Sequence, residues 1–265
     1  MSETKTPGFR EIANQLGSGV VTIAEGWRQG RTAYGGMTAG LLMAAIARDF
    51  PDLPPLRSSQ ISFVGPVDAS PVFKTRLLRK GRNVVTIEAK VLSGDNVCGA
   101  AICMFGAARE FDRSQQLPAP SLPNPEDCVP LIRGKALQFT PLFVRQFETL
   151  LVEGAPPMSG AKAPYIRCWS RHADPESRTG IDSFICLGDV LPPAAMATYK
   201  SVKAVSSMNW QLNILVDDVT SEDGWYQIET RQSAAEGGYS SQIMRFWNRK
   251  GDLIAEGLQS VAIFI

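Results

Sequence analysis

The stretch TAYGGMTAGLLMAAIARDF, residues 32–50, decides the fold. No charged residue occurs from Thr32 to Ala47, and apolar side chains recur there at helical spacing, while glycines keep one side of the expected helix slim. A helix that is apolar on nearly all faces must be buried nearly all round. It is too short and too rich in glycine to span a bilayer. We therefore expect a curved antiparallel sheet to wrap around it.

The sequence on both sides of this helix has the pattern of such a sheet. The helix is expected to begin near Gly35 and to end at Phe50, before Pro51. Four strands are predicted after it from alternating apolar and polar residues separated by turns, over 57–67, 72–79, 85–91 and 97–105. A first strand is predicted over Val20–Trp27. Strand, long helix and four antiparallel strands make one hotdog unit.

The second half repeats this order after a proline-rich connection over 107–138. Strands are predicted over 139–153 and 164–172, a helix over 181–191, and four strands over 204–215, 225–233, 239–247 and 253–265. RSSQISF at Arg57 is similar to VSSMNWQ at Val205, and SGDNVCGAAICMF at Ser93 to KGDLIAEGLQSVA at Lys250. We predict an α+β fold of tandem hotdogs: an N-terminal unit over 1–108, a linker over 109–138 and a C-terminal unit over 139–265.

Composition removes several classes of function. The formal net charge of the 265 residues is +1, which gives no reason to expect nucleic acid or an anionic membrane as a partner. The N-terminus has no apolar signal segment and the five cysteines form no CxxC pair, so we expect reduced thiols and a cytoplasmic protein. The single histidine, His172, excludes a histidine-rich metal centre. We interpret it as a surface residue at a strand end, and no metal is expected.

The chain resembles the double-hotdog acyl-CoA thioesterases of the thioesterase II type. The resemblance rests on TAYGGMTAGLL and RSSQISFVGPVDASPV in the first half, and on IDSFICLGDVLPP, SSMNWQL and GDLIAEGLQSVAIF in the second. It implies a hydrolase of fatty acid metabolism that converts an acyl-CoA thioester to free acid and coenzyme A by direct attack of water. No cofactor is implied, because coenzyme A is part of the substrate. Since hotdog sheets expose edges that can pair, a homodimer or higher homo-oligomer is expected.

The resemblance also implies which residues hold the reactive water. They are Asp182 in the first turn of the second-half helix, Ser207 on the next strand and Gln259 on the last strand. A helix start favours a carboxylate anion, which fits Asp182. Strict alternation turns Ser207 away from the face of Trp210, so either this strand has a bulge near its start or Ser206 is the inward residue.

Substrate binding is implied for the start of the first helix, at Tyr34, Gly35, Gly36 and Met37. Their backbone N–H groups can approach a thioester carbonyl and stabilise the oxyanion that develops there. The alternative interpretation is that the glycines only permit tight packing. At the repeat offset the first half has no counterpart of the acid or of the amide, so one reactive centre per chain is expected.

Two other functions remain open from the sequence. A non-catalytic acyl-CoA-binding protein would show the same pocket walls. An enoyl-CoA hydratase or dehydratase of hotdog fold would normally carry a Gly-Asp-x-Asn-Pro run, which this sequence lacks. Candidate cations for the phosphates of coenzyme A are Arg28, Arg31, Arg79, Lys80 and Arg82, and the sequence does not choose among them.

Overall fold

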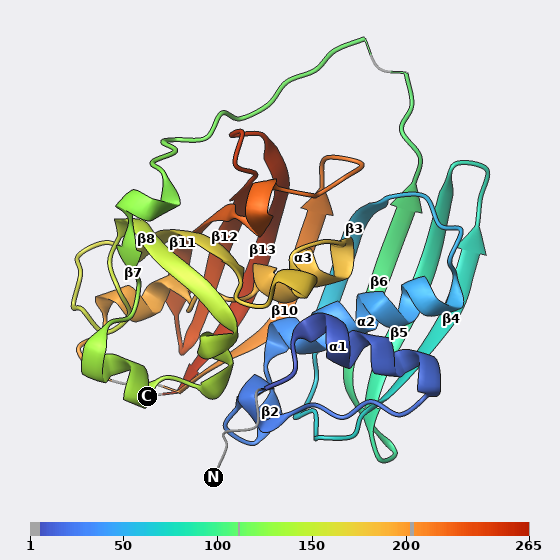
Figure 1. Ribbon diagram of the computed structural model, residues 1–265, viewed down its shortest axis with the longest axis horizontal. Helices are drawn as coiled ribbons and strands as arrows, with labels where there is room; N and C mark the ends of the chain where they lie inside the picture. Colours follow the sequence, from blue (N-terminus) through green and yellow to red (C-terminus); the bar gives the residue numbers. More distant parts are fainter. Residues whose placement is uncertain (1–5, 111, 202–203, 265) are drawn as a thin grey trace.

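One antiparallel sheet of eleven strands curves around two central helices in the computed structural model, which describes residues 6–110, 112–201 and 204–264. Across the sheet the strand order is β4-β5-β6-β3-β10-β13-β12-β11-β9-β8-β7 (Figure 1). The bounds are β3 (Leu56–Phe63), β4 (Val72–Lys80), β5 (Val84–Ser93), β6 (Asn96–Gly106), β7 (Val129–Pro130), β8 (Phe147–Gly154), β9 (Tyr165–His172), β10 (Ala204–Ile214), β11 (Tyr226–Glu236), β12 (Tyr239–Trp247) and β13 (Leu253–Phe264). A separate hairpin joins β1 (Arg28–Gln29) to β2 (Thr32–Ala33).

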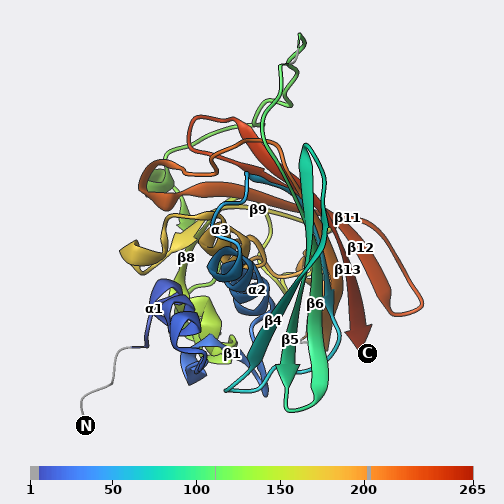
Figure 2. The same cartoon turned by 90° about the vertical axis from the view of Figure 1, so that its right-hand side faces the viewer.

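The predicted central helix forms as α2 (Gly35–Asp49) and lies in the concave side of the sheet (Figure 2). Its residues from Gly36 to Ile46 are all buried, which confirms the interpretation of the uncharged stretch. The second-half helix, α3 (Ile181–Gly188), packs across α2, and α1 (Phe9–Asn14) lies on the side of α2 away from the sheet (Figure 2). The three helices thus form a layer of their own against the sheet.

The two halves join through their central strands. β3 of the first half pairs with β10 of the second, with Gln60 opposite Gln211, so two hotdog sheets become one continuous sheet. The helices meet where α2 has glycine. A Cβ atom on Gly36 would lie 2.2 Å from the carbonyl oxygen of Cys186, and one on Gly40 would lie 2.8 Å from that of Asp182. The slim side of α2 therefore lets the two helix backbones touch.

Four sequence predictions about elements need correction, and one of them, the strand predicted over 57–67, ends at Phe63. Val20–Trp27 is not a strand. The Ile23 N–H donates a hydrogen bond to the carbonyl oxygen of Ala69, which lies in a loop, and Glu25–Trp27 forms a 3₁₀ turn. The strand predicted over 139–153 begins only at Phe147, since 3₁₀ turns occupy the residues before it. The helix predicted over 181–191 ends at Gly188. The last predicted residue of the final strand, Ile265, lies outside the described residues.

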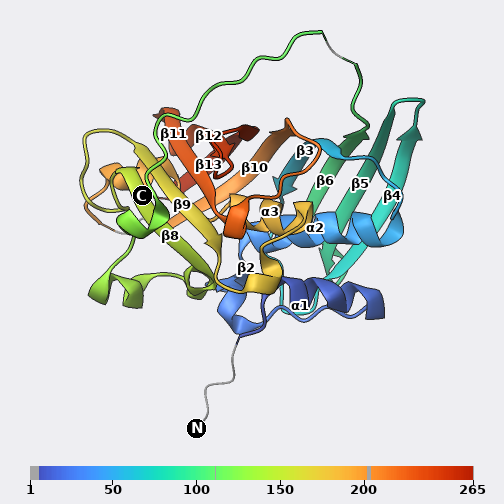
Figure 3. The same cartoon turned by 45° about the horizontal axis from the view of Figure 1, so that its top comes forward.

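The connection between the halves leaves β6 and arcs away from the sheet before returning to the C-terminal half (Figure 3). On its return it is fixed by two indole N–H groups, which Trp247 and Trp169 donate to the carbonyl oxygens of Leu117 and Pro123. Within the predicted linker, Val129–Pro130 forms β7 and pairs with β8. The domain bounds themselves stay a prediction. Among the described residues, no helix is long and apolar enough to cross a membrane.

Candidate active site

The candidate site lies where α3 ends and α2 begins. Because the two helices cross at glycines, the residue after α3, Asp189, is brought to the first turn of α2. A Cβ atom placed on Gly35 would lie 2.5 Å from Asp189 Oδ2. Only glycine leaves room for this carboxyl group at the helix start.

Gln259 of β13 reaches the same carboxyl group from the sheet. Its Nε2 donates a hydrogen bond of 2.7 Å to Asp189 Oδ1. The prediction that its amide points inward is confirmed, since Gln259 is buried on the face of β13 that it shares with Val261. An acid, an amide and a helix N-terminus therefore meet at one point.

The surroundings of Asp189 change its acidity. The residue as a whole is partly exposed, yet desolvation of the carboxyl group raises its pKa to about 7. The hydrogen bond from Gln259 and the backbone N–H of Gly36 act in the opposite direction and favour the charged form. A carboxyl group with a pKa near 7 is well suited to accept a proton at neutral pH.

Ser207 is turned toward this site by an irregularity in β10. The register of β10 against β13 shifts between Ser207 and Asn209, which leaves Met208 as the extra residue of a β-bulge. Ser207 consequently shares the inward face with Trp210, as the first of the two sequence alternatives requires. It pairs with Val261, two residues along β13 from Gln259. Ser207 and Gln259 are thus diagonal neighbours on one face of the sheet.

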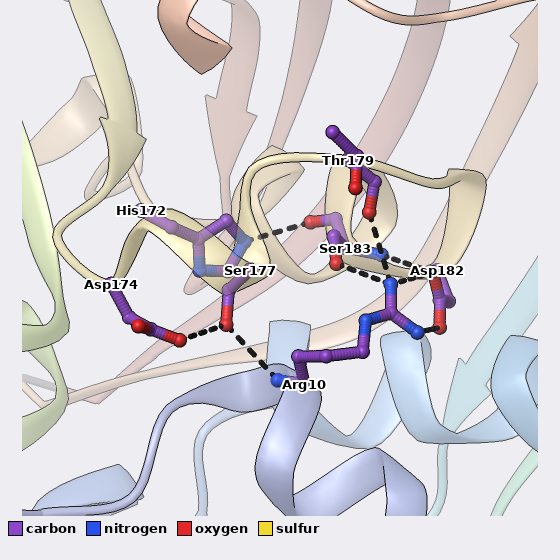
Figure 4. A network of polar contacts seen from close by, with 7 residues as sticks. All are labelled: Arg10, His172, Asp174, Ser177, Thr179, Asp182 and Ser183. Atoms are coloured by element: carbon purple, nitrogen blue, oxygen red, sulfur yellow. Dashed lines mark hydrogen bonds and ion pairs between the residues drawn. The ribbon is translucent and has the colours of Figure 1, made fainter.

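The structure does not bring Asp182 to Gln259, and the predicted trio needs correction here. Both oxygens of Asp182 accept hydrogen bonds of 2.7 Å from the Arg10 guanidinium, which comes from α1 (Figure 4). The same guanidinium donates to the Ser183 hydroxyl and to the Thr179 carbonyl oxygen (Figure 4). Asp182 therefore joins α1 to the start of α3, while Asp189 is the acid beside Gln259.

His172 also differs from its interpretation as a surface residue. It is buried, and its Nε2 lies 2.9 Å from the Ser183 carbonyl oxygen (Figure 4). The rings of Phe9, Trp27 and Phe147 surround it. Desolvation lowers its pKa to about 4, so the imidazole is neutral near pH 7. The segment before α2, which the sequence assigned to a strand, folds over this ring and buries it.

The predicted substrate-binding residues all lie at the start of α2. Tyr34 precedes the helix, stacks on the Phe143 ring at a centroid distance of 4.0 Å, and donates its hydroxyl hydrogen to the Cys186 carbonyl oxygen. Met37 is fully buried. The first three N–H groups of a helix have no partner within it, and here that of Gly36 already faces Asp189.

Sequence reasoning missed Asp189, although the sequence carries a signal for it. The run ICLGDVLPP places an acid in the middle of an otherwise apolar stretch that was assigned to a helix. Gly188 is typical of a helix end, and Pro192 cannot continue a helix. An acid at a helix start, such as Asp182, is readily explained as a cap. An acid just past a helix end and before prolines, such as Asp189, is less easily explained in this way.

Fold and site together define a double hotdog in which an acid and an amide, Asp189 and Gln259, meet at the start of α2. The chain belongs to the acyl-CoA thioesterase family, whose N-terminal domain matches residues 23–106 and whose C-terminal domain matches residues 125–263. No curated protein sequence matches the chain.

Solved structures share the fold across nearly the whole chain. A protein of unknown function with a hot dog fold from Alicyclobacillus acidocaldarius is 19% identical, with a TM-score of 0.82, covering 93% of this chain and 92% of that one. A putative thioesterase II from Thermobifida fusca is 15% identical, with a TM-score of 0.77 and the same coverage. The acyl-CoA thioesterase II TesB2 from Mycobacterium marinum is 18% identical, with a TM-score of 0.72, covering 97% and 98%. At these identities the likeness shows the fold.

Proposed function

We propose that the protein is an acyl-CoA thioesterase in which Asp189 activates water for direct attack on the thioester carbonyl. The observation that carries this proposal is the hydrogen bond between Gln259 and Asp189 at the start of α2. It places a proton acceptor with a pKa of about 7 beside backbone N–H groups that can stabilise negative charge. The family of the chain supports thioester hydrolysis in general.

The proposed reaction needs no group beyond these residues and the substrate. The Asp189 carboxylate takes a proton from water, and the hydroxide forms a bond to the carbonyl carbon. The resulting oxyanion is stabilised at the start of α2, where Gly35 and Met37 offer N–H groups. Its collapse breaks the C–S bond and releases coenzyme A as thiolate, an easy leaving group because thiol pKa values lie near 8.5. Asp189 then gives its proton to the thiolate or to solvent, which restores the base.

Gln259 and Ser207 position the water in this proposal. Gln259 and the Gly36 N–H hold the carboxyl group in place, and the remaining lone pairs of Asp189 accept the water in this proposal. The Ser207 hydroxyl, on the same face of the sheet, supplies a second contact to the water or to the carbonyl oxygen. For the phosphates of coenzyme A we favour Arg28 and Arg31, because their hairpin leads directly into Tyr34.

The deciding experiment is thiol release from a panel of acyl-CoAs with short, long, branched and aromatic acyl groups, with binding measured by calorimetry on the same panel. Release that depends on Asp189 supports the proposal and identifies the acyl class. Binding of acyl-CoA without any release would instead support a non-catalytic acyl-CoA-binding protein. The homo-oligomer and the cytoplasmic location stay predictions.

A further inference from the structure

A second buried glutamine stands directly behind Gln259. Gln242 lies opposite Gln259 in the register of β12 and β13, and both side chains are buried. Gln242 Nε2 donates a hydrogen bond of 2.6 Å to Gln259 Oε1, and Gln242 Oε1 accepts one of 2.9 Å from the backbone N–H of Ala194. A chain of hydrogen bonds therefore runs from Ala194 through both amides to Asp189.

The direction of this chain is set at its far end. A backbone N–H can only donate, so the atom of Gln242 that faces Ala194 must be the carbonyl oxygen. The Gln242 NH₂ group then faces Gln259, which must present its own oxygen there. As a result, the Gln259 NH₂ group is the end that reaches Asp189.

Without this constraint the Gln259 amide could turn over. The two ends of a glutamine amide have nearly the same shape but opposite hydrogen-bonding roles. In the reversed orientation the oxygen of Gln259 would face the carboxylate of Asp189, acceptor against acceptor. We propose that Gln242 is a positioning residue, which fixes the amide orientation of Gln259 and keeps its N–H directed at Asp189. As far as it concerns turnover, this inference rests on the proposed thioesterase function.

Other titratable groups near Asp189 do not obscure its titration. They are Tyr34 at the start of α2 and Cys186 of α3, and burial raises the pKa of both, so that both are neutral at neutral pH. Among the described residues no cation contributes to the pKa of Asp189. A change in the hydrogen bond from Gln259 should therefore appear directly in the titration of Asp189.

The test replaces Gln242 by methionine, which keeps the length of the side chain and removes both hydrogen-bonding ends. Gln227 is the matched control: it is an equally buried glutamine, but its Nε2 donates to the Ser121 carbonyl oxygen on the outer side of the sheet. The titration of Asp189 is followed by NMR of ¹³Cγ-labelled aspartate and assigned by its loss in Asp189→Asn. We expect Gln242→Met to raise the pKa of Asp189 by about one unit. Gln227→Met should leave it unchanged.

Turnover supplies a second measurement. The pH midpoint of kcat/KM should move upward with the NMR value in Gln242→Met, with kcat at pH 7 reduced several-fold and KM nearly constant. In a Gln259→Met background, Gln242→Met should cause no further shift, because the amide through which it acts is gone. A purely structural role of Gln242 would instead lower stability to the same extent in Gln242→Met and in Gln227→Met. It would leave the pH midpoints of the NMR titration and of kcat/KM in place.

The outcomes separate the two proposals. An unchanged Asp189 titration in folded Gln242→Met overturns the positioning role even if the enzyme hydrolyses acyl-CoA. A shifted titration without any hydrolysis in wild type upholds the positioning role and overturns the proposed function. If Gln242→Met does not fold, Gln242→Glu keeps the acceptor for the Ala194 N–H and removes the donor when ionised. The shift that Gln242→Glu causes in the pKa of Asp189 should then be smaller when Gln259 is also replaced by methionine. An equal shift with and without Gln259 would overturn the inference.

Discussion

The two ends of α3 carry two aspartates in opposite situations. Asp182, in the first turn, accepts hydrogen bonds from both terminal nitrogens of the Arg10 guanidinium and lies at the helix end that favours an anion. Asp189, just past the last turn, lies at the end that offers an anion no stabilisation from α3. Its partners are a neutral amide and the start of another helix.

This difference separates a carboxylate that holds the fold from one that is available for chemistry. The charge of Asp182 is neutralised by Arg10, and its oxygens are occupied. The charge of Asp189 is not compensated by a cation in the described chain, so its carboxyl group exchanges its proton near pH 7. A perturbed pKa in a partly exposed residue beside backbone donors marks a candidate functional group.

The strongest test of this comparison replaces each aspartate by asparagine. Asp189→Asn keeps the acceptor for Gln259 but removes the base, and we expect kcat/KM for acyl-CoA hydrolysis to fall by about 10²–10⁴-fold. Asp182→Asn should change it by less than about threefold. Thiol release measured for both variants at pH 8 decides between them. A large loss in Asp182→Asn with an active Asp189→Asn would return the catalytic role to Asp182.

A second test crowds Asp189 without altering its chemistry. In Gly35→Ala the new methyl group would lie 2.5 Å from Asp189 Oδ2, so the carboxyl group must move away from the start of α2. A misplacement of this size can reduce the rate by about 10²-fold, and we expect kcat to fall accordingly. The control is Gly65→Ala, where a Cβ atom meets nothing within 4 Å. Full activity of folded Gly35→Ala would show that Asp189 does not need this position.

A third test uses the acidity that distinguishes Asp189. Because the base must be ionised and its pKa is about 7, kcat/KM should rise with pH up to about 7 and then level off. Below that pH it should fall about tenfold per unit. A rate profile from pH 5 to 9 measures this, with His172 excluded as the source because burial lowers its pKa to about 4. A flat profile across this range would contradict a base role for Asp189.

The fold was predictable because its signals are local. The uncharged, glycine-containing run before Arg48 specifies a buried helix without knowledge of its neighbours, and the alternating runs after it specify strands. The repeat then predicts the same order of helix and strands in the second half. The errors fall where tertiary contacts override weak patterns, as at Val20–Trp27, where a short apolar run covers His172 rather than pairing in the sheet.

The site was only partly predictable, because its partners are distant in sequence. Gln259 stood out as an amide on an apolar strand face, and that interpretation needed only the period of a strand. From the sequence, Asp182 is a reasonable choice for the acid of the site. It is excluded only by its pairing with Arg10, which lies 172 positions earlier. Assigning the acid to Asp189 requires the end of α3 to be known within a turn, and Gln242 requires the register of β12 against β13.

The smallest expected effect on activity concerns the start of α3, where Arg10 pairs with Asp182. Arg10→Ala should lower the free energy of unfolding by about 1–3 kcal/mol, because the Asp182 side chain is left largely buried without its cation. Asp182→Asn should cost a similar amount, and the double variant less than the sum, since the two residues share one interaction. Denaturant unfolding at pH 7 measures all three, and the activity of each should stay within about threefold of wild type.

Additive losses would show that Arg10 and Asp182 act separately. A large loss of activity in Arg10→Ala at unchanged stability would show that the two ends of α3 are not independent, because the clamp at Asp182 would then set the position of Asp189.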